Sequence, residues 1–447
     1  MADTTVTRVR VDENSVAAAR DFLTLIIPSP RQFDIRLWDD TLIRADRHIG
    51  PPITLRIASP GSVRRMFRPP LELNLAEAYL RGDFEVEGSL IDIFKAARDV
   101  MDSPRLLREL PHLASLWARL PTDPPQREIE RTAVRLSGGV HSKERDKAAL
   151  QYHYDVGNDF YALWLGPRMV YTCAYFKTGD EDIDTAQGQK LDHICHKLRL
   201  QPGERVLDIG CGWGGFVIHA AQHYGVKAVG VTLAEKQHAF ANQRIRELGL
   251  QDRVEVRLMD YRDLSGEESE QFDKLVSIGM FEAVGKSHMP EYFSHAFRLL
   301  KTYGVFLNHG ITSYRLETQR KTGARKWLDD TLIGAGKFGN KYIFPDGELV
   351  PLHDVNHMAE AAGFEVRDVE NLREHYSLTL RRWVAGLEAR RDEATRISNE
   401  TIYRTWRLYM SSAAYEFDTA RQHLTQTLLA KPDVSGNTHL PLTREDW

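Results

Sequence analysis

A glycine loop between a predicted strand and a predicted helix constrains the fold of this chain more than any other feature. The loop lies in DIGCGWGG, residues 208–215, and contains the pattern G-x-G-x-x-G. The apolar RVLDI before it is typical of a buried strand, and FVIHAAQHY after it is typical of a helix. Glycines at such a turn let the backbone approach a ligand whose negative group is favoured at the helix N-terminus. The pattern fits a dinucleotide or S-adenosylmethionine, and the alternative is a loop that only turns the chain.

Strands and helices alternate after this loop. Apolar strand patterns recur in VKAVGVT (226–232), RVEVRLM (253–259), DKLVSIGM (273–280) and GVFLNHGI (304–311), separated by segments of helix length. Apolar strands that alternate with helices form a parallel sheet covered on both faces. The sequence therefore predicts a Rossmann-like α/β domain with a mostly parallel sheet. It also predicts helices throughout residues 380–428.

A smaller α+β unit is predicted before this domain. FDIRLW (33–38) and ITLRIAS (53–59) alternate apolar and polar residues as half-buried strands do, and residues 75–97 indicate helix, strand and helix. The Pro-rich PTDPPQ and the polar run after it have little to bury, which is typical of a linker. We therefore expect an N-terminal α+β domain over residues 1–120, a linker over 121–144 and the Rossmann-like domain, with C-terminal helices, over 145–447.

A basic and apolar segment of the N-terminal unit is a candidate for membrane contact. SVRRMFRPP contains Arg64, Arg65 and Arg68 beside Met66 and Phe67. Cations near anionic lipid contribute on the order of 1 kcal/mol each. The same pattern also fits a solvated turn, and the sequence leaves both interpretations open.

Composition limits the compartment and the partners. The net charge of −4 over 447 residues gives no overall attraction to nucleic acid. Cys173, Cys195 and Cys211 form no C-x-x-C pair, and their odd number indicates a reducing cytoplasm. The N-terminal segment lacks an apolar signal core, and the apolar stretches are shorter than the ~20 residues of a bilayer span. No closely spaced His and Cys ligands indicate a metal site. These features predict a soluble cytoplasmic protein.

The end of the second predicted strand of the α/β domain discriminates between the two cofactors. A nicotinamide dinucleotide site has an acidic residue there, which binds the ribose hydroxyls. In this chain the strand ends in Gly230, Val231 and Thr232, without an acid. The sequence therefore favours S-adenosylmethionine over NAD.

Five ordered sequence blocks resemble the cyclopropane fatty acid synthases, which include the mycolic acid cyclopropane synthases. The blocks are YTCAYF, VLDIGCGWGGF, GVTLAEKQ, MFEAVG and KYIFPDG. The resemblance implies a class I S-adenosylmethionine-dependent methyltransferase with a smaller, lipid-binding N-terminal domain. From the residues alone, Gln237 could also be a solvated helix residue and Tyr261 a packing residue at a strand end. The cofactor-binding residues that the resemblance implies are Tyr171, Thr172, Asp208, Gly210, Gly212, Thr232, Gln237 and Tyr261.

The resemblance also implies a reaction at the cis double bond of an acyl chain in a membrane phospholipid. Methylation of this alkene leaves a carbocation, and ring closure needs a base that removes a proton from the new methyl group. A dry site with aromatic faces tolerates the cation. Because a carboxylate beside the sulfonium risks methylation, the family uses bound bicarbonate as the base. The residues implied to hold bicarbonate are Cys173, Glu282, His309, Ile311 and Tyr376.

These residues also have plainer interpretations. A free cysteine such as Cys173 is most often an inert core residue, and His309 could be a structural histidine at a strand end. In the bicarbonate site, only the backbone of Cys173 has a task, and its thiol has none. Glu282 is harder to explain structurally, because it follows an apolar strand at the edge of the sheet where ligands bind. Many relatives have His after this Glu, whereas this chain has Ala283.

Three functions remain open at this point. The first is cyclopropane formation, the second is methylation of the same alkene to a methylene- or methyl-branched chain, and the third is lipid binding without catalysis. The intact glycine loop and the five bicarbonate-binding positions count against the third. The resemblance further implies a homodimer that is peripherally associated with the inner face of the membrane.

Overall fold

The chain divides into two compact units. The structure is a computed structural model that describes residues 13–48, 50–97, 109–131, 134, 136–264, 269–314, 331, 334 and 336–445. The first unit contains residues 1–132, 321–338 and 404–408, and the second contains residues 133–320, 339–403 and 409–447. The sequence predicts that the N-terminal segment lacks an apolar signal core. Residues 1–12 of this segment lie outside the described residues.

The first unit is built on a four-stranded sheet with the order β2-β1-β3-β4. Strand β3 pairs parallel with β1 and antiparallel with β4. The strands that FDIRLW and ITLRIAS predict are β1 and β3, and residues 75–97 form the predicted helix, strand and helix. The elements are α1 (Glu13–Ile26), β1 (Asp34–Arg36), β2 (Leu42–Ile43), β3 (Thr54–Ile57), α2 (Ser62–Met66), α3 (Leu71–Arg81), β4 (Phe84–Glu87), α4 (Leu90–Ala96) and α7 (Leu110–Arg119).

The basic segment of this unit makes several contacts within the unit, so it is not simply a solvated turn, while its contact with lipid stays a prediction. Arg65 forms ion pairs with Asp83 at 2.6 Å and with Asp123 at 2.7 Å. The guanidinium of Arg64 lies 4.3 Å from the ring centroid of Trp117, and Met66 is only 1% exposed. Arg64, Arg65 and Phe67 nevertheless stay partly exposed, and Arg68 is exposed.

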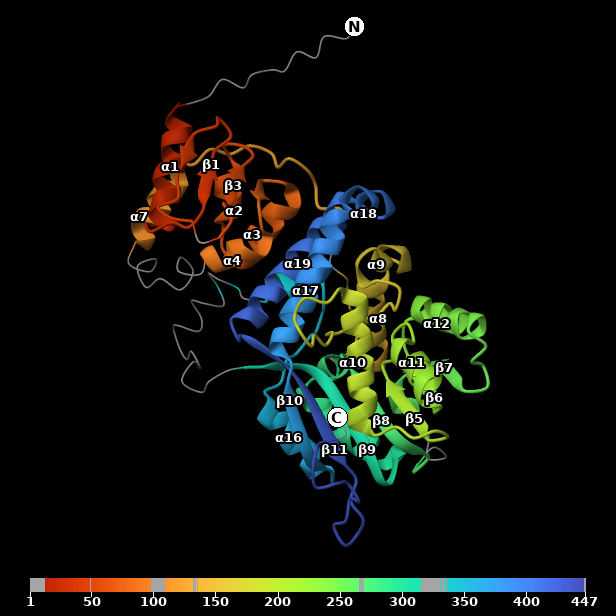
Figure 1. The fold of residues 1–447 in the computed structure, drawn as a ribbon. Coiled ribbons are helices and arrows are strands. Elements are labelled where there is room, and N and C mark those ends of the chain that lie inside the picture. Colours follow the sequence, from red (N-terminus) through yellow and green to blue (C-terminus); the bar gives the residue numbers. More distant parts are fainter. Residues whose placement is uncertain are drawn as a thin grey trace. The chain divides into compact units, whose positions relative to one another are not determined.

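The second unit contains a seven-stranded sheet with the order β10-β11-β9-β8-β5-β6-β7 (Figure 1). Neighbouring strands from β7 to β9 pair in parallel, as the alternating pattern predicts, and β11 runs antiparallel between β9 and β10. The strands are β5 (Arg205–Ile209), β6 (Lys227–Thr232), β7 (Val254–Leu258), β8 (Phe272–Ile278), β9 (Leu300–Ser313), β10 (Glu365–Asn371) and β11 (Gln422–Ala430).

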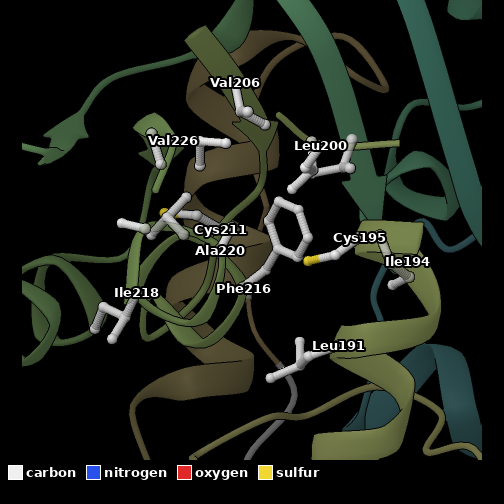
Figure 2. Packing of buried hydrophobic residues seen from close by; sticks show 14 of the residues in the cluster. Leu191, Ile194, Cys195, Leu200, Val206, Cys211, Phe216, Ile218, Ala220 and Val226 are labelled. Carbon is white, nitrogen blue, oxygen red and sulfur yellow. The ribbon is translucent and has the colours of Figure 1, made fainter. Parts of the chain in front are cut away.

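Helices cover both faces of this sheet. One apolar core packs α10, α11 and α12 against the sheet, and a second packs α13 and α16 against the other face. Figure 2 shows Cys195 and Cys211 among the apolar side chains of the first core, around Phe216. The helices of the unit are α8 (Lys143–Tyr154), α9 (Asn158–Leu165), α10 (Ile183–Leu198), α11 (Gly215–Tyr224), α12 (Glu235–Glu247), α13 (Met289–Leu299), α16 (Leu352–Ala361), α17 (Arg373–Ala389) and α18 (Arg391–Ile397). Two further helices, α15 (Lys337–Tyr342) and α19 (Glu400–Asp418), have residues in both units.

The expectation of helix throughout residues 380–428 is wrong at its end, because β11 begins at Gln422. This strand lies inside the sheet and is buried along most of its length, so its side chains lack the alternating polarity of a half-buried strand. The β-branched Thr425 and Thr427 were the available sign of a strand. Among the described residues, no helix has the length and apolar composition to cross a bilayer.

The ion pairs of Arg65 predict a strong local effect on stability. Arg65→Met would leave the carboxylate of Asp83, whose side chain is fully buried, without its cation. Removing one partner of a buried pair costs about 3 kcal/mol or more. We expect faster amide hydrogen exchange in α2 and β4 of this variant. Arg68→Met, at an exposed residue, is the control. Equal protection in the two variants would show that the pairs contribute little.

Candidate active site

The predicted site residues collect at one edge of the second sheet. Parallel strands present their carboxyl ends at the same edge, where ligands of α/β proteins bind. Strand β5 leads into Gly210, β6 ends at Thr232 and β8 leads to Glu282. Strand β9 carries His309 and Ile311 near its end. The sheet topology therefore brings together residues that are far apart in the sequence.

The glycine loop after β5 has the backbone geometry that only glycine adopts readily. Gly210 and Gly212 have φ angles of 88° and 55°. A Cβ atom on Gly210 would lie 2.6 Å from the side chain of Met280. The N–H groups of Gly210 and Cys211 both donate to the carbonyl oxygen of Val231, each at 3.0 Å. The loop is thus fixed against the end of β6, with no room for a side chain at Gly210.

Asp208, the last polar residue before this loop, is a buried carboxyl group. It is 2% exposed, and its Oδ1 has no hydrogen-bond partner among the described residues. Burial raises the pKa of Asp208 to about 7, and the nearby Lys190 opposes this rise. A buried carboxyl oxygen without a partner is suited to a cationic ligand. The loop and this carboxyl together fit S-adenosylmethionine, which carries a sulfonium and an ammonium group.

Lys190 of α10 is a site residue that sequence reasoning missed. Its side chain is 1% exposed, and its Nζ donates to the Thr172 hydroxyl at 3.0 Å. Burial lowers the pKa of Lys190 to about 8, and Cys173 and Asp208 oppose this shift. Lys190 therefore links the YTCAYF segment electrostatically to the glycine loop. Nothing in the helix pattern around Lys190 distinguishes it from a surface lysine.

The residues after β6 form the second half of the predicted cofactor site. The Thr232 hydroxyl donates to Gln237 Oε1 at 3.0 Å, and Gln237 is 2% exposed. The alternative of Gln237 as a solvated helix residue is therefore wrong. Tyr261 follows β7 and is half-buried, with its ring 5.7 Å from that of Tyr292 in an edge-to-face arrangement. This contact agrees with the packing role of Tyr261 and leaves its ring at the same sheet edge as Thr232.

Glu282 forms the centre of the predicted bicarbonate site. Its Oε1 accepts a hydrogen bond from the Ile311 N–H at 2.7 Å, and its buried Oε2 has no partner among the described residues. Burial raises the pKa of Glu282 to about 7, although the Ile311 N–H opposes the rise. Ile311 was predicted to donate to an anion from its backbone. In this structure that donor holds Glu282.

Tyr376 lies near this carboxyl group, and Cys173 lies near Tyr376. Burial raises the pKa of the Cys173 thiol, and its Sγ donates to the carbonyl oxygens of Ala174 at 3.2 Å and Leu372 at 3.9 Å. A protonated thiol engaged with backbone oxygens is a poor nucleophile. Burial also raises the pKa of the Tyr376 hydroxyl, and the neighbouring Cys173 and Glu282 raise it further. Tyr376 is therefore a neutral hydroxyl donor beside Glu282.

His309 is a buried, neutral imidazole. It is 1% exposed, and burial holds the pKa of His309 well below its usual value. Its Nδ1 lies 3.1 Å from Nε2 of Gln426, which sequence reasoning did not predict as a site residue. Its Nε2 has no hydrogen-bond partner among the described residues. The imidazole thus has one ring nitrogen held by β11 and the other available.

An aromatic cluster adjoins these polar groups. Ring centroids of Tyr171 and Trp383 are 5.3 Å apart, and those of Tyr154 and Trp213 are 5.4 Å apart. Tyr154 also lies close enough to Glu282 for the carboxylate to raise its pKa. Such rings present π faces, which attract cationic charge. The members of this cluster are His153, Tyr154, Tyr161, Trp164, Tyr171, Trp213 and Trp383.

The strand order, the glycine loop and the end of β6 without an acid define an S-adenosylmethionine-dependent methyltransferase. Comparison with known proteins identifies the branch of this class. A family model described as mycolic acid cyclopropane synthetase matches residues 141–427, and a second, described as a domain of unknown function, matches residues 28–104. The chain belongs to the mycolic acid cyclopropane synthetase family.

Individual relatives extend over most of the chain. A probable fatty acid methyltransferase of Pseudomonas putida is 37% identical over 92% of this chain and 95% of its own length. The cyclopropane-fatty-acyl-phospholipid synthase of Escherichia coli K12 is 32% identical over 90% of this chain and 94% of its own. A crystal structure of a mycolic acid cyclopropane synthase complexed with SAH and CTAB is 34% identical. It covers 64% of this chain and 98% of its own, with a TM-score of 0.59.

The close approach of Gly210 to Met280 predicts a specific loss of cofactor binding. Gly210→Ala places a Cβ 2.6 Å from Met280 and must displace the loop. We expect at least about tenfold weaker S-adenosylmethionine binding by calorimetry, which corresponds to ~1.4 kcal/mol. Gly203→Ala is the matched control, because Gly203 has a similar φ of 87° and open space around its Cβ position. Equal affinity of the two variants would exclude this loop from the cofactor site.

Proposed function

We propose that the protein transfers a methylene group from S-adenosylmethionine to the cis double bond of unsaturated acyl chains in membrane phospholipids, forming cyclopropane fatty acids. The observation that carries this proposal is the setting of Glu282. It presents one buried carboxyl oxygen that has no partner in the described part of the chain, close to an aromatic cluster, and the nearby Cys173 thiol is protonated. This arrangement suits a reaction that passes through a cation and ends in proton removal.

The cofactor would supply an electrophilic methyl group bound to sulfonium. Tyr171 and Thr172 would hold its methionine end with Asp208, Gly210 and Gly212. The aromatic cluster around Tyr171 would exclude water and stabilise the carbocation on the acyl chain, because π faces attract positive charge more strongly where water is absent. This environment delays capture of the cation by water until a proton is removed.

A small anion in the Glu282 site would remove this proton. Glu282 Oε2 is positioned to accept the proton of a bicarbonate, while His309 Nε2 and the Tyr376 hydroxyl are available to donate to its oxygens. A bicarbonate held in this way keeps its remaining oxygen free to act as the base. Cys173 would contribute its backbone and a compact side chain, not its thiol.

The relatives support an acyl substrate. The Escherichia coli relative is named for cyclopropane formation on fatty acyl phospholipids, and the Pseudomonas putida relative for methylation of fatty acids. The second name favours one further candidate, methylation of the same alkene to a methylene- or methyl-branched chain. Both reactions share the residues described above. We also propose that the N-terminal domain contacts the cytoplasmic face of the membrane. We further propose that the protein forms a homodimer.

Proton NMR of the product lipid distinguishes the candidate reactions. We expect the upfield resonances of cyclopropane protons after incubation with S-adenosylmethionine and vesicles of unsaturated phospholipid. Vinyl signals would instead identify a methylene-branched product. Cofactor binding without any product would support the third candidate, a lipid-binding protein without catalysis.

Substitutions of Cys173 and Glu282 separate a thiol mechanism from an anion-based one. Cys173→Ser preserves the backbone and the approximate volume, so we expect substantial activity. Glu282→Gln removes the acceptor that orients the bicarbonate proton, and we expect a loss of about 10²–10⁴-fold in turnover. If Cys173→Ser is inactive but folded and still binds cofactor, the result would support the hypothesis that the thiol is a nucleophile.

The raised pKa of Glu282 predicts a pH dependence of activity. Because burial raises this pKa to about 7, the carboxyl group is largely protonated at pH 6 and ionised at pH 8. Only the ionised form accepts a proton from bicarbonate. Turnover at saturating cofactor and bicarbonate should therefore fall as the pH decreases through about 7. A rate that stays constant from pH 6 to 8 would show that Glu282 does not need to be ionised.

A further inference from the structure

A row of polar side chains crosses three strands behind the Glu282 site. Gln426 of β11 lies opposite His309 of β9 and opposite Glu370 of β10. Side chains of such cross-strand partners project from the same face of the sheet. The two β11 neighbours of Gln426 on this face, Leu424 and Leu428, are apolar and buried. The polar row is therefore a local feature within an apolar surface.

The contact between Gln426 and His309 fixes where the imidazole carries its proton. Nε2 of Gln426 lies 3.1 Å from Nδ1 of His309, and both residues are at most 1% exposed. An amide nitrogen only donates, so Nδ1 must accept through its lone pair. The single proton of the neutral ring is then on Nε2. This N–H is buried and has no partner among the described residues.

Burial and the charged groups around His309 keep it neutral. Burial lowers the pKa of His309 most, Lys190, Lys197 and His193 of α10 lower it further, and Glu370 of β10 opposes this shift. Glu370 is engaged by His193 at 2.7 Å and by Lys197 at 2.5 Å. Gln426 lies between Glu370 and His309 in the strand register, and its neutral amide does not take up a proton from imidazole. The carboxylate therefore has no direct contact through which to charge the ring.

We propose that Gln426 is a positioning residue that holds His309 as the neutral Nε2–H tautomer. In this form His309 offers one hydrogen-bond donor to an anionic oxygen. The inference rests on the proposed function for the identity of that anion, bicarbonate. With the proton on Nδ1 instead, the Nε2 lone pair would face the oxygen and repel it. Gln426→Glu would favour that state, because its carboxylate would accept a hydrogen bond from Nδ1–H.

The tautomer is measurable in the wild-type protein. Nitrogen chemical shifts distinguish the protonated from the unprotonated ring nitrogen in full-length protein labelled with ¹⁵N-histidine. The His309→Gln variant assigns the signal by its disappearance. We expect His309 to show a protonated Nε2 and an unprotonated Nδ1 between pH 6 and 9. A protonated Nδ1, alone or in an imidazolium, would overturn the inference.

Variants of β11 test the functional consequence. Gln426→Met removes the donor at similar length, and we expect mixed tautomers in the spectra. The bicarbonate concentration for half-maximal turnover should rise by about 10–100-fold, as when other second-layer partners of an active-site His are lost. S-adenosylmethionine affinity by calorimetry should not change. Gln426→Glu should shift the proton to Nδ1.

Thr427→Val is the matched control, because Thr427 is the adjacent residue of β11, is 1% exposed and projects from the opposite face. It should leave both the tautomer and the bicarbonate dependence unchanged. If Gln426→Met lowers the stability but leaves the His309 tautomer unchanged, Gln426 is only a packing residue. This result would overturn the inference. The spectra do not depend on turnover, so a failure of the proposed function and a failure of this inference are distinguishable.

Discussion

The hydrogen bond from the Ile311 N–H to Glu282 Oε1, at 2.7 Å, fixes the geometry on which the rest of the site depends. It connects β9 to the short 3-10 helix after β8, and it requires glycine at position 310. A Cβ there would lie 2.0 Å from the ring of Phe281 and 3.1 Å from Glu282 Oε1. One carboxyl oxygen is therefore held by the sheet, and the other is left for a ligand. The neutral hydroxyl of Tyr376 lies near this carboxyl group, and the neutral imidazole of His309 is carried by the same strand as Ile311.

Around this bond, the protein keeps ionisable groups in a desolvated state. Burial moves the pKa values of Asp208 and Glu282 up to about 7 and that of Lys190 down to about 8. Each shift means that burial disfavours the charged form. The same desolvation strengthens the interaction with any charge that a ligand brings. A cationic cofactor beside Asp208 would interact with a carboxyl group of opposite charge, whereas an anion beside Glu282 would have to share a proton with it, because both carry negative charge.

The sequence predicts much of this arrangement because its strongest patterns are local. The strand before Gly210, the turn itself and the strand that ends at Thr232 follow from periodicity and glycine positions. Lys190 and Gln426 could not be predicted, because a buried lysine and a buried glutamine have the same local pattern as exposed ones. Their roles arise from contacts across the fold, with Thr172 in one case and His309 in the other. Strand β11 was mistaken for helix because burial on both faces removes the alternating polarity.

The position of β11 makes the candidate site depend on two parts of the second unit. The loop after β5 and the ends of β8 and β9 supply the groups that act on charge. The helices between β10 and β11 supply Tyr376 of α17 and Tyr409 of α19, which lie near Glu282 and Tyr171. These helices are a connection between neighbouring strands, so changes in them need not disturb the register that holds Glu282 and His309. A substitution of Tyr376 would therefore remove one neighbour of Glu282 without changing that register.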